Sequence, residues 1–375
     1  MNIVEFLDTL STAEITFFAG VPDSQLSLFC DEIARRYGCF NANHVITHNE
    51  GGAVAIASGH HLATGKVSCV YMQNSGLGNV LNPVVSLAHP NVYGIPILFI
   101  VGWRGEPGIH DEPQHIYQGE ITLQLLKDME VEYYIIDEST TIEQIRDTLG
   151  TFSALFSEGK SAAYVVRKGA FTGNAYQYGN EFSLNREKAI DIILEATKTD
   201  PIISTTGKIS RELFELREQR MENHQRDFLT VGSMGHCLMI ACGISLEKPQ
   251  QRVWCIDGDG SALMHMGSLG VVGSLSPENL VHIVLNNAAH ETVGGMPTVA
   301  AKGLDFQGIA VASGYSRSLL VTDEESLKST LEQVKTLKGP LFIEVLVALG
   351  SRSDLGRPTT TTHENKRMFM GFLED

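Results

Sequence analysis

The chain has 375 residues, a formal net charge of −16 and 43% hydrophobic residues. This length is typical of two domains, and the acidic charge argues against nucleic-acid or anionic-membrane partners. No apolar run reaches the roughly 20 residues that span a membrane, and the acidic N-terminus lacks the basic region of a signal peptide. Six scattered cysteines without metal-ligand spacing favour reduced thiols. We therefore expect a cytoplasmic protein.

The first half of the chain alternates helical patterns with short apolar runs. Strands are predicted at residues 15–19, 44–48, 67–71, 95–101, 131–136 and 162–166. Strands separated by helices in this way are typical of a doubly wound parallel sheet. Because the carboxyl ends of parallel strands share one edge, the polar residues that follow each strand are candidate site residues.

The first two strands are each followed by polar residues at the expected start of a helix. Asp23, Ser24 and Gln25 follow the first strand, where they could cap the helix or bind a ligand. Glu50 follows the second strand and stands at a helix start, where the helix dipole also favours a carboxylate. Both positions therefore allow a structural and a functional interpretation.

Two further loops at the same edge carry candidate residues. Ser75 and Gly76 lie in the loop after 67–71, which could contact a cofactor ring. The loop 102–115 is rich in glycine and proline and holds His110 and His115, a mixture typical of active-site loops. These histidines could carry protons or bind an anion, or could simply be exposed to solvent.

The composition changes after Lys168, where the chain becomes polar and rich in turn residues. We interpret residues 171–185 as a linker between a first domain, 1–170, and a second domain, 186–375. Strands of the second domain are predicted at residues 201–205, 228–230, 252–256, 280–285 and 341–347. Gly207 follows the first of these in a turn that suits a phosphate, although the spacing of a P-loop is absent.

The sequence Gly258-Asp259-Gly260-Ser261 ends the strand at 252–256, and a helix is predicted from Ser261. The glycines allow a sharp turn and close approach to a ligand, and the free N–H groups of a helix start bind anions. Asp259 would repel a phosphate unless a divalent cation lay between them. Asn287 ends the adjacent strand, and carboxylate and amide oxygens suit Mg²⁺. A plain helix cap by Asp259 is the alternative.

Gly-Asp-Gly followed by Asn286-Asn287 resembles the signature of thiamine diphosphate (ThDP) enzymes. The resemblance covers nearly the whole chain and implies an α/β protein with two doubly wound parallel-sheet domains of the ThDP-binding fold. The first domain would bind the pyrimidine and the second the diphosphate. Mg²⁺ would be held by the side chains of Asp259 and Asn287 and by the carbonyl of Ala289.

The resemblance also implies roles for individual residues. Glu50 would bond the pyrimidine ring nitrogen and promote the imino tautomer. Met234 would wedge between the cofactor rings and bend the cofactor, with an ordinary core methionine as the alternative. The other implied cofactor contacts are Ser75, Gly76, Gly207, Gly232, Ser233, Gly258, Gly260 and Ser261. Because the family's cofactor lies between domains of two subunits, the resemblance implies a homodimer or higher homo-oligomer with active sites at the subunit interface.

The chain has no room for the third domain of most ThDP decarboxylases, and in this it resembles the two-domain decarboxylases of phosphonopyruvate and sulfopyruvate. The implied activity is decarboxylation of 3-phosphonopyruvate to phosphonoacetaldehyde and carbon dioxide, in phosphonate biosynthesis. Sulfopyruvate or another 2-oxoacid is the alternative substrate. A carboligase of the acetolactate synthase type and a non-catalytic phosphate-binding regulator are further alternatives. Arg352 and Arg357 could bind the anionic substrate or belong to a solvated tail.

Overall fold

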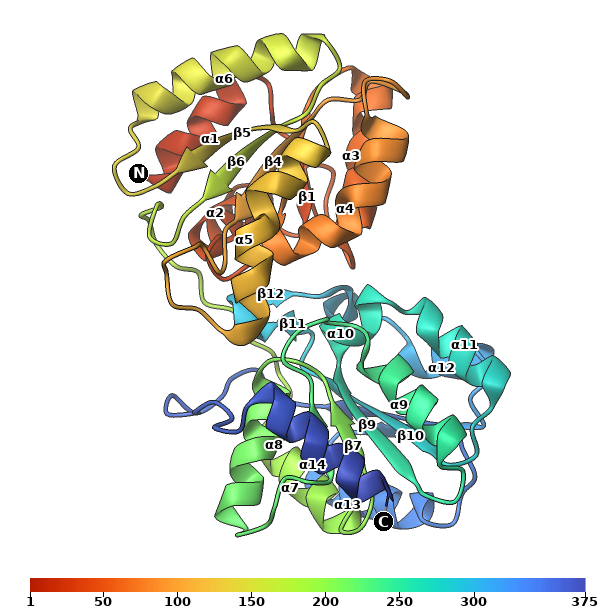
Figure 1. Ribbon diagram of the computed structural model, residues 1–375. Helices are drawn as coiled ribbons and strands as arrows, with labels where there is room; N and C mark the ends of the chain where they lie inside the picture. Colours follow the sequence, from red (N-terminus) through yellow and green to blue (C-terminus); the bar gives the residue numbers. More distant parts are fainter. Residues whose placement is uncertain (375) are drawn as a thin grey trace. The chain divides into compact units, whose positions relative to one another are not determined.

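The computed structural model describes residues 1–374, which form two compact units (Figure 1). The N-terminal unit comprises Met1–Tyr178 and Val293–Pro297, and the C-terminal unit comprises Gly179–Thr292 and the chain from Thr298 onward. The division after Tyr178 falls inside the segment 171–185. Among the described residues, no helix combines the length and the apolar character that a membrane crossing requires.

The N-terminal unit is built on a six-stranded sheet in which every neighbouring pair is parallel. The strand order is β2-β1-β3-β4-β6-β5. β3 and β4 read as nearly continuous apolar runs because both faces of a doubly wound sheet are covered by helices. The strands are β1 (Phe18–Gly20), β2 (His44–Ile46), β3 (Ser68–Gln73), β4 (Ile97–Gly102), β5 (Glu132–Ile136) and β6 (Ala162–Val166).

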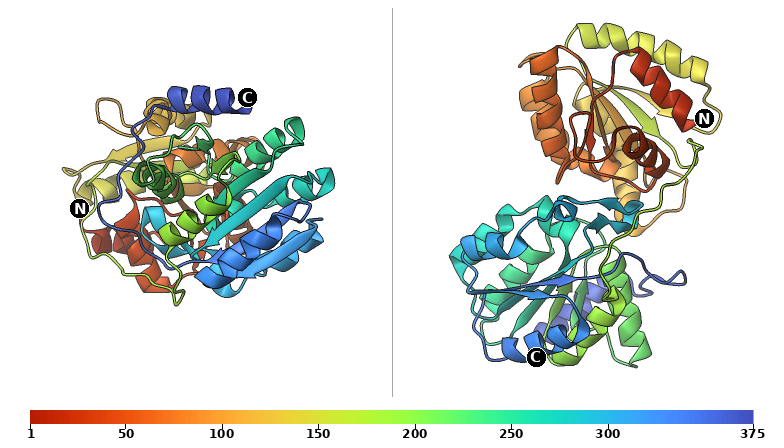
Figure 2. Two further views of the ribbon diagram at one scale, coloured as in Figure 1. Left: turned by 90° about the horizontal axis from the view of Figure 1, so that it is seen from below. Right: turned by 180° about the vertical axis from the view of Figure 1, so that it is seen from behind.

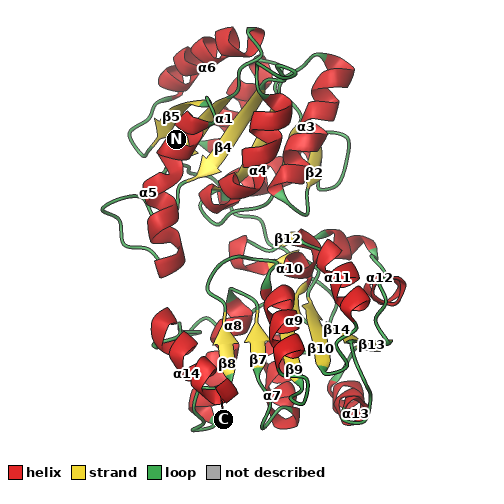
Figure 3. Ribbon diagram, turned by 45° about the vertical axis from the view of Figure 1, so that its right-hand side comes forward, coloured by secondary structure: helices red, strands yellow, loops and turns green. Residues whose placement is uncertain are grey.

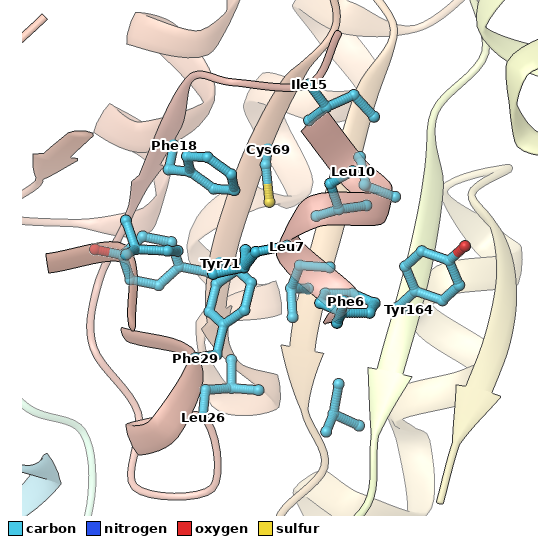
Figure 4. Packing of buried hydrophobic residues seen from close by; sticks show 14 of the residues in the cluster. Phe6, Leu7, Leu10, Ile15, Phe18, Leu26, Phe29, Cys69, Tyr71 and Tyr164 are labelled. Atoms are coloured by element: carbon cyan, nitrogen blue, oxygen red, sulfur yellow. The ribbon is translucent and has the colours of Figure 1, made fainter. Parts of the chain in front are cut away.

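Helices cover both faces of this sheet. One face packs against α1 (Ile3–Thr12), α2 (Ser27–Tyr37) and α6 (Ile142–Ser157), and the other against α3 (Glu50–Thr64), α4 (Leu77–Pro83) and α5 (Pro113–Asp128). Two short turns, η1 (Asn74–Gly76) and η2 (Val84–Ala88), flank α4. Aromatic side chains fill the first interface: Phe6 meets Tyr164 edge to face at 5.7 Å, and Phe29 meets Tyr71 at 5.8 Å (Figure 4). Such pairs each contribute about 0.5–1.5 kcal/mol beyond their buried area.

The C-terminal unit repeats the architecture of the first. Its all-parallel sheet has the order β13-β14-β10-β9-β7-β8. Read from β8 (Figure 3) and counted along the chain, this order is second, first, third, fourth, sixth, fifth. The N-terminal sheet has the same order. The strands are β7 (Ile202–Ser204), β8 (Asp227–Leu229), β9 (Val253–Gly258), β10 (Leu280–Asn286), β13 (Arg317–Val321) and β14 (Leu341–Leu346).

The helices of the C-terminal unit form two layers (Figure 2). One face of the sheet packs against α7 (Arg186–Ala196), α8 (Lys208–Gln219) and α13 (Glu324–Val334). The other packs against α9 (Cys237–Glu247), α10 (Asp259–Met264), α11 (Gly267–Leu275), α12 (Phe306–Ala312) and α14 (Thr362–Glu374). Shorter elements are β11 (Ala289–His290), η3 (Glu291–Val293), β12 (Met296–Pro297) and η4 (Val299–Lys302). The prediction of an α/β chain with two doubly wound parallel sheets is thus confirmed.

Candidate active site

Glu50 is the first residue of α3 and is buried at the carboxyl end of the N-terminal sheet. The side-chain amide of Asn79 donates to its Oε2 at 2.7 Å. Burial raises the pKa of Glu50, and the bond from Asn79 only partly opposes this shift. A carboxyl group in such a site holds a proton more readily than one in water, so Glu50 can act as a hydrogen-bond donor.

Gly76 lies against the Glu50 carboxyl group. A Cβ atom at Gly76 would fall 2.6 Å from Glu50 Oε1, so only glycine fits at this position. The exposed neighbour Ser75 donates to the side-chain oxygen of Gln73 at 2.8 Å, and Gln73 in turn donates to Asp23 Oδ1 at 2.7 Å. A hydrogen-bonded chain therefore joins the loops that follow β1 and β3.

Asp23 is fully buried, and burial raises the pKa of its carboxyl group. Its Oδ2 accepts the backbone N–H of Gln25 at 3.0 Å. The helix expected at Ser24 begins only at Ser27, because Asp23 and Gln25 form a turn that precedes α2. Ser24 and Gln25 belong to this turn and are half-buried.

A cleft of about 1040 Å³ lies at the same edge of the N-terminal sheet. It is lined by residues that follow β1, β4, β5 and β6, among them Ser24, Gln25 and His110. His115 is not among the lining residues, since α5 begins at Pro113 and the predicted loop 102–115 ends earlier than expected. The cleft thus brings together three of the predicted site residues, whereas the predicted residues Asp23, Glu50, Ser75, Gly76 and His115 do not line it.

Arg104 organises one wall of this cleft. Its guanidinium donates to both carboxylate oxygens of Asp111, at 2.7 and 2.5 Å, and to Ser24 Oγ at 3.1 Å. Although burial alone would raise the pKa of Asp111, its bonds from Arg104 hold that pKa well below its usual range. Asp111 is therefore a permanent anion that anchors the loop after β4.

The second half of the predicted site lies in the C-terminal unit, where the structure corrects one local prediction. β9 runs through Gly258, whose backbone is extended with φ −116°, and α10 begins at Asp259 instead of Ser261. The glycine turn expected at 258–260 is therefore absent. Gly260 instead lies in close packing, since a Cβ there would lie 3.2 Å from Met234 Cε and from His290 Nδ1.

Asp259 is a buried carboxylate at the carboxyl end of β9. Thr298 Oγ1 donates to its Oδ2 at 2.5 Å, yet burial raises the pKa of Asp259 to about 7. A buried carboxylate with so high a proton affinity is one that a divalent cation would stabilise in place of the proton. The environment of Asp259 therefore fits the Mg²⁺ that the sequence pattern implies.

Asn287 follows β10, the strand beside β9. Its Nδ2 donates to Glu291 Oε2 at 2.6 Å, and its Oδ1, the atom that a hard cation binds, accepts the N–H of Ala289 at 3.1 Å. Ala288 adopts φ +57°, a left-handed conformation that is costly for a residue with a Cβ. This strained turn reverses the backbone between Asn287 and Ala289, the two remaining predicted ligands.

Glu291 is fixed by two basic side chains. Arg186 forms a short ion pair with it, and Lys208 Nζ lies 2.9 Å from its Oε1. Lys208 opens α8 directly after Gly207, which has φ +93° and whose Cβ would lie 3.0 Å from Thr292 Cγ2. Gly207 thus combines a left-handed backbone with a close contact, so the loop after β7 requires glycine.

The segment after β8 carries the remaining predicted cofactor residues. Ser233 and Gly235 both have positive φ, 55° and 90°. Ser261 Oγ accepts the N–H of Gly235 at 3.0 Å and the hydroxyl of Thr205 at 2.9 Å, so it ties this segment to β7 and α10. Gly232 and Met234 are half-buried within it. Strained backbone of this kind is concentrated at functional sites.

The two arginines of the C-terminal segment differ in their surroundings. Arg352 is paired with Glu187 at 3.0 Å, with Asp354 at 3.2 Å and with Glu215. Its charge is therefore already balanced, and an incoming anion would have to displace these carboxylates. Arg357 is exposed.

Several residues that shape both halves are absent from the sequence prediction: Gln73, Asn79, Arg104, Glu291 and Thr298. Gln73 and Asn79 could have been found, since they flank the predicted Ser75-Gly76 loop. Thr298 lies 39 positions after Asp259 in no recognisable motif, so only the fold reveals it.

Family comparisons agree with this geometry. The chain matches the N-terminal TPP binding domain of thiamine pyrophosphate enzymes over residues 4–131 and their C-terminal TPP binding domain over residues 205–345. The chain therefore belongs to the thiamine pyrophosphate enzymes, in which thiamine pyrophosphate is another name for ThDP.

Curated relatives narrow the class of reaction. A phosphonopyruvate decarboxylase of Streptomyces viridochromogenes is 34% identical over 96% of this chain and 91% of its own length. One of Streptomyces hygroscopicus is 33% identical over 99% and 94%, and a sulfopyruvate decarboxylase of Methanosarcina acetivorans is 25% identical over 92% of each chain. The protein is thus a ThDP-dependent 2-oxoacid decarboxylase, a carbon–carbon lyase.

Proposed function

We propose that the protein decarboxylates 3-phosphonopyruvate to phosphonoacetaldehyde and carbon dioxide, as a step of phosphonate biosynthesis in the cytoplasm. The observation that carries this choice of substrate is the identity of 33–34% over nearly the full length to two phosphonopyruvate decarboxylases, against 25% to a full-length sulfopyruvate decarboxylase. Sulfopyruvate is the second candidate on the strength of that relative. Free cysteines, five of them buried, support the cytoplasmic location.

The chemistry is divided between the cofactor and the chain. When bound, ThDP supplies a nucleophilic carbon and an electron sink for the electron pair that remains when carbon dioxide departs. Asp259, Asn287 and the Ala289 carbonyl would hold Mg²⁺ on its diphosphate, for which the raised pKa of Asp259 and the orientation of Asn287 are the support. Gly207, Gly232, Ser233, Gly258, Gly260 and Ser261 would line the diphosphate.

Glu50 would hold a proton at the pyrimidine ring. Burial raises the pKa of its carboxyl group, and Asn79 occupies Oε2, which leaves Oε1 for the ring nitrogen. Gly76 allows the ring to approach because it adds no side chain beside Oε1. Met234, next to Gly260, would support the bent cofactor.

The N-terminal cleft would receive the anionic substrate. Ser24, Gln25 and the Arg104 guanidinium line it, and His110 is the exposed group there that could return a proton to the product. Asp23, buried behind them, would position this edge through Gln73. Roles for His115, Arg352 and Arg357 receive less support from their surroundings.

The test of the substrate is carbon dioxide release with ThDP and Mg²⁺, with phosphonopyruvate, sulfopyruvate and pyruvate compared at equal concentration. We expect the highest kcat/KM for phosphonopyruvate. A preference for sulfopyruvate would agree with ThDP-dependent decarboxylation but would contradict phosphonopyruvate as the substrate. The Glu50→Gln variant should bind ThDP and Mg²⁺ yet lose turnover; unchanged turnover would overturn the role of Glu50.

We also propose a homodimer or higher homo-oligomer in which the Glu50 half of one chain completes the Asp259 half of another. Mixing the inactive variants Glu50→Gln and Asp259→Asn tests this arrangement. A mixed dimer would contain one intact site, so random mixing should restore roughly a quarter of the wild-type sites. A mixture that stays inactive although the subunits exchange would contradict shared sites.

A further inference from the structure

Four buried side chains with metal-binding atoms, none of them assigned to the cofactor, gather on one face of the C-terminal sheet. Cys237 is the first residue of α9. Cys255 and Asp257 alternate along β9 and so point to the same face, and His282 on β10 is the direct neighbour of Cys255 in the sheet. All four are at most 2% exposed.

The distances among Cys237, Cys255 and Asp257 fit three ligands of a tetrahedral metal site, and His282 lies beside Asp257. The two sulfur atoms are 3.7 Å apart, and the ligand atoms of Cys237, Cys255 and Asp257 all lie within 4.8 Å of one another. His282 Nε2 lies 3.5 Å from Asp257 Oδ2. Tetrahedral zinc, with bonds of about 2.3 Å to sulfur and about 2.0 Å to oxygen or nitrogen, would separate its sulfurs by about 3.8 Å and its oxygen and nitrogen by about 3.3 Å.

Two atoms of the cluster need a partner. Within residues 1–374, Asp257 Oδ2 and His282 Nε2 have no hydrogen-bond partner although they are buried. The opposite atom of each group is anchored: Asp257 Oδ1 accepts the N–H of Gly258 at 2.8 Å, and His282 Nδ1 lies 3.3 Å from the Tyr315 hydroxyl. Leaving a buried polar atom unpaired costs about 1–3 kcal/mol, a cost that a bound cation removes.

We propose that the chain binds a zinc ion through the thiolates of Cys237 and Cys255, Asp257 Oδ2 and His282 Nε2, at a site separate from the magnesium site. Thiolate and imidazole ligands select zinc over Mg²⁺. The ion offsets two of the three negative charges of the ligands, and both thiol protons leave when it binds. The two cysteines, 18 positions apart, lack the short spacing of zinc motifs, so the site is formed only by the fold.

The position of this site suggests its role. Cys237 directly follows the Gly232–His236 segment, and Asp257 directly precedes Gly258 and Asp259. Zinc would therefore join the start of α9 to the end of β9. These two elements adjoin the predicted cofactor residues in Gly232–His236 and at Gly258 and Asp259. A structural zinc site of this kind stabilises the fold directly.

The test is the metal content of the purified full-length chain after dialysis against EDTA, measured by plasma mass spectrometry. We expect stoichiometric zinc in the wild type and its loss in Cys237→Ser and Cys255→Ser. Cys242→Ser is the matched control, because Cys242 is a buried thiol on α9 outside the cluster, and it should retain zinc. Cobalt added to the zinc-free protein should give a thiolate-to-cobalt charge-transfer band in the near ultraviolet that is absent in Cys255→Ser.

Measurements on the wild-type protein alone can contradict the proposal, so the test does not depend on whether the variants fold. Zinc-free protein from zinc-supplemented cells that also gives no cobalt band would show that the four side chains form an ordinary buried polar cluster. Retention of zinc by both single cysteine variants would equally contradict the assigned ligands.

Discussion

The side-chain amide of Asn287 donates to Glu291 Oε2 at 2.6 Å while its Oδ1 accepts the N–H of Ala289 at 3.1 Å, and these two bonds fix the orientation of the amide. Glu291 cannot swing away, because Arg186 and Lys208 bind its carboxylate from α7 and α8. A buried ionic network therefore orients the proposed magnesium ligand without touching the ion.

Glu291→Gln should weaken Mg²⁺-dependent ThDP binding. The substitution removes the charge that Arg186 and Lys208 hold and allows the amide of Asn287 to rotate. Loss of a residue that orients a ligand typically reduces metal affinity 10–100-fold, which calorimetric titration of ThDP at varied Mg²⁺ would measure. Glu187→Gln, which affects only the partly exposed pair with Arg352, is the control. Equal Mg²⁺ affinity in Glu291→Gln and wild type would refute the orienting role.

Gly76→Ala should abolish most activity while Gly78→Ala should not. The added Cβ at Gly76 falls 2.6 Å from Glu50 Oε1 and displaces the carboxyl group, whereas Gly78 has open space around its Cβ position. If Glu50 moves the proton we propose, kcat/KM should fall by about 10²–10⁴-fold in Gly76→Ala. Gly78→Ala should gain up to about 1 kcal/mol of stability, because alanine is the better helix former. Similar kcat/KM values in the two variants would contradict the steric argument.

The sequence could predict that the Glu50 half and the Asp259 half of the site each lie at the carboxyl edge of a parallel sheet, because this depends on strands that are buried on both faces. Runs such as Ile97–Gly102 and Val253–Gly258 are unmistakably buried, and polar residues at their carboxyl ends must share an edge. β13 escaped prediction because Arg317–Val321 is an edge strand whose burial is partial, so its sequence resembles a loop.

Details that depend on packing could not be predicted in this way. Gly258 was expected to form a turn, yet its strand continues, since a glycine in a buried strand has the same local sequence as a glycine in a turn. The bond between Thr298 and Asp259 joins residues with no periodic relationship. The zinc cluster is hidden for the same reason, because Cys237 reaches Cys255 only when α9 packs on β9.

Arg104→Lys should raise the KM for the 2-oxoacid with little effect on ThDP binding. A lysine cannot reproduce the two parallel bonds to Asp111 and the contact with Ser24. Since hydrogen bonds to charged groups contribute about 1.5–3 kcal/mol, KM should rise about tenfold or more if this loop shapes the substrate site. Steady-state kinetics and ThDP titration would measure both quantities, with Arg146→Lys as the control because the Arg146 side chain on α6 is exposed. An unchanged KM would exclude Arg104 from substrate binding.

The N-terminal unit should lose stability as the pH falls from 6.5 to about 4, because its buried His44 resists protonation. His44 is fully buried; its Nδ1–H donates to the Gly38 carbonyl at 2.6 Å, and its Nε2 accepts the Tyr71 hydroxyl at 2.8 Å. Burial lowers the pKa of His44 from 6.5 to about 4. The folded chain therefore holds His44 neutral in a pH range where the unfolded chain protonates it.

The sign follows from that difference in proton binding. The contribution of His44 is fully present above pH 6.5, and it is lost as the pH falls towards 4, because the unfolded state binds the extra proton first. The loss is at most about 3 kcal/mol.

Urea unfolding at several pH values should show this slope in the wild type and a flatter one in His44→Asn, which keeps a donor for Gly38 but cannot be protonated. Tyr71→Phe should raise the pKa of His44, measured by NMR, because it frees Nε2 to accept a proton. If the free energy of unfolding varies with pH equally in the wild type and in His44→Asn, groups other than His44 cause the acid sensitivity.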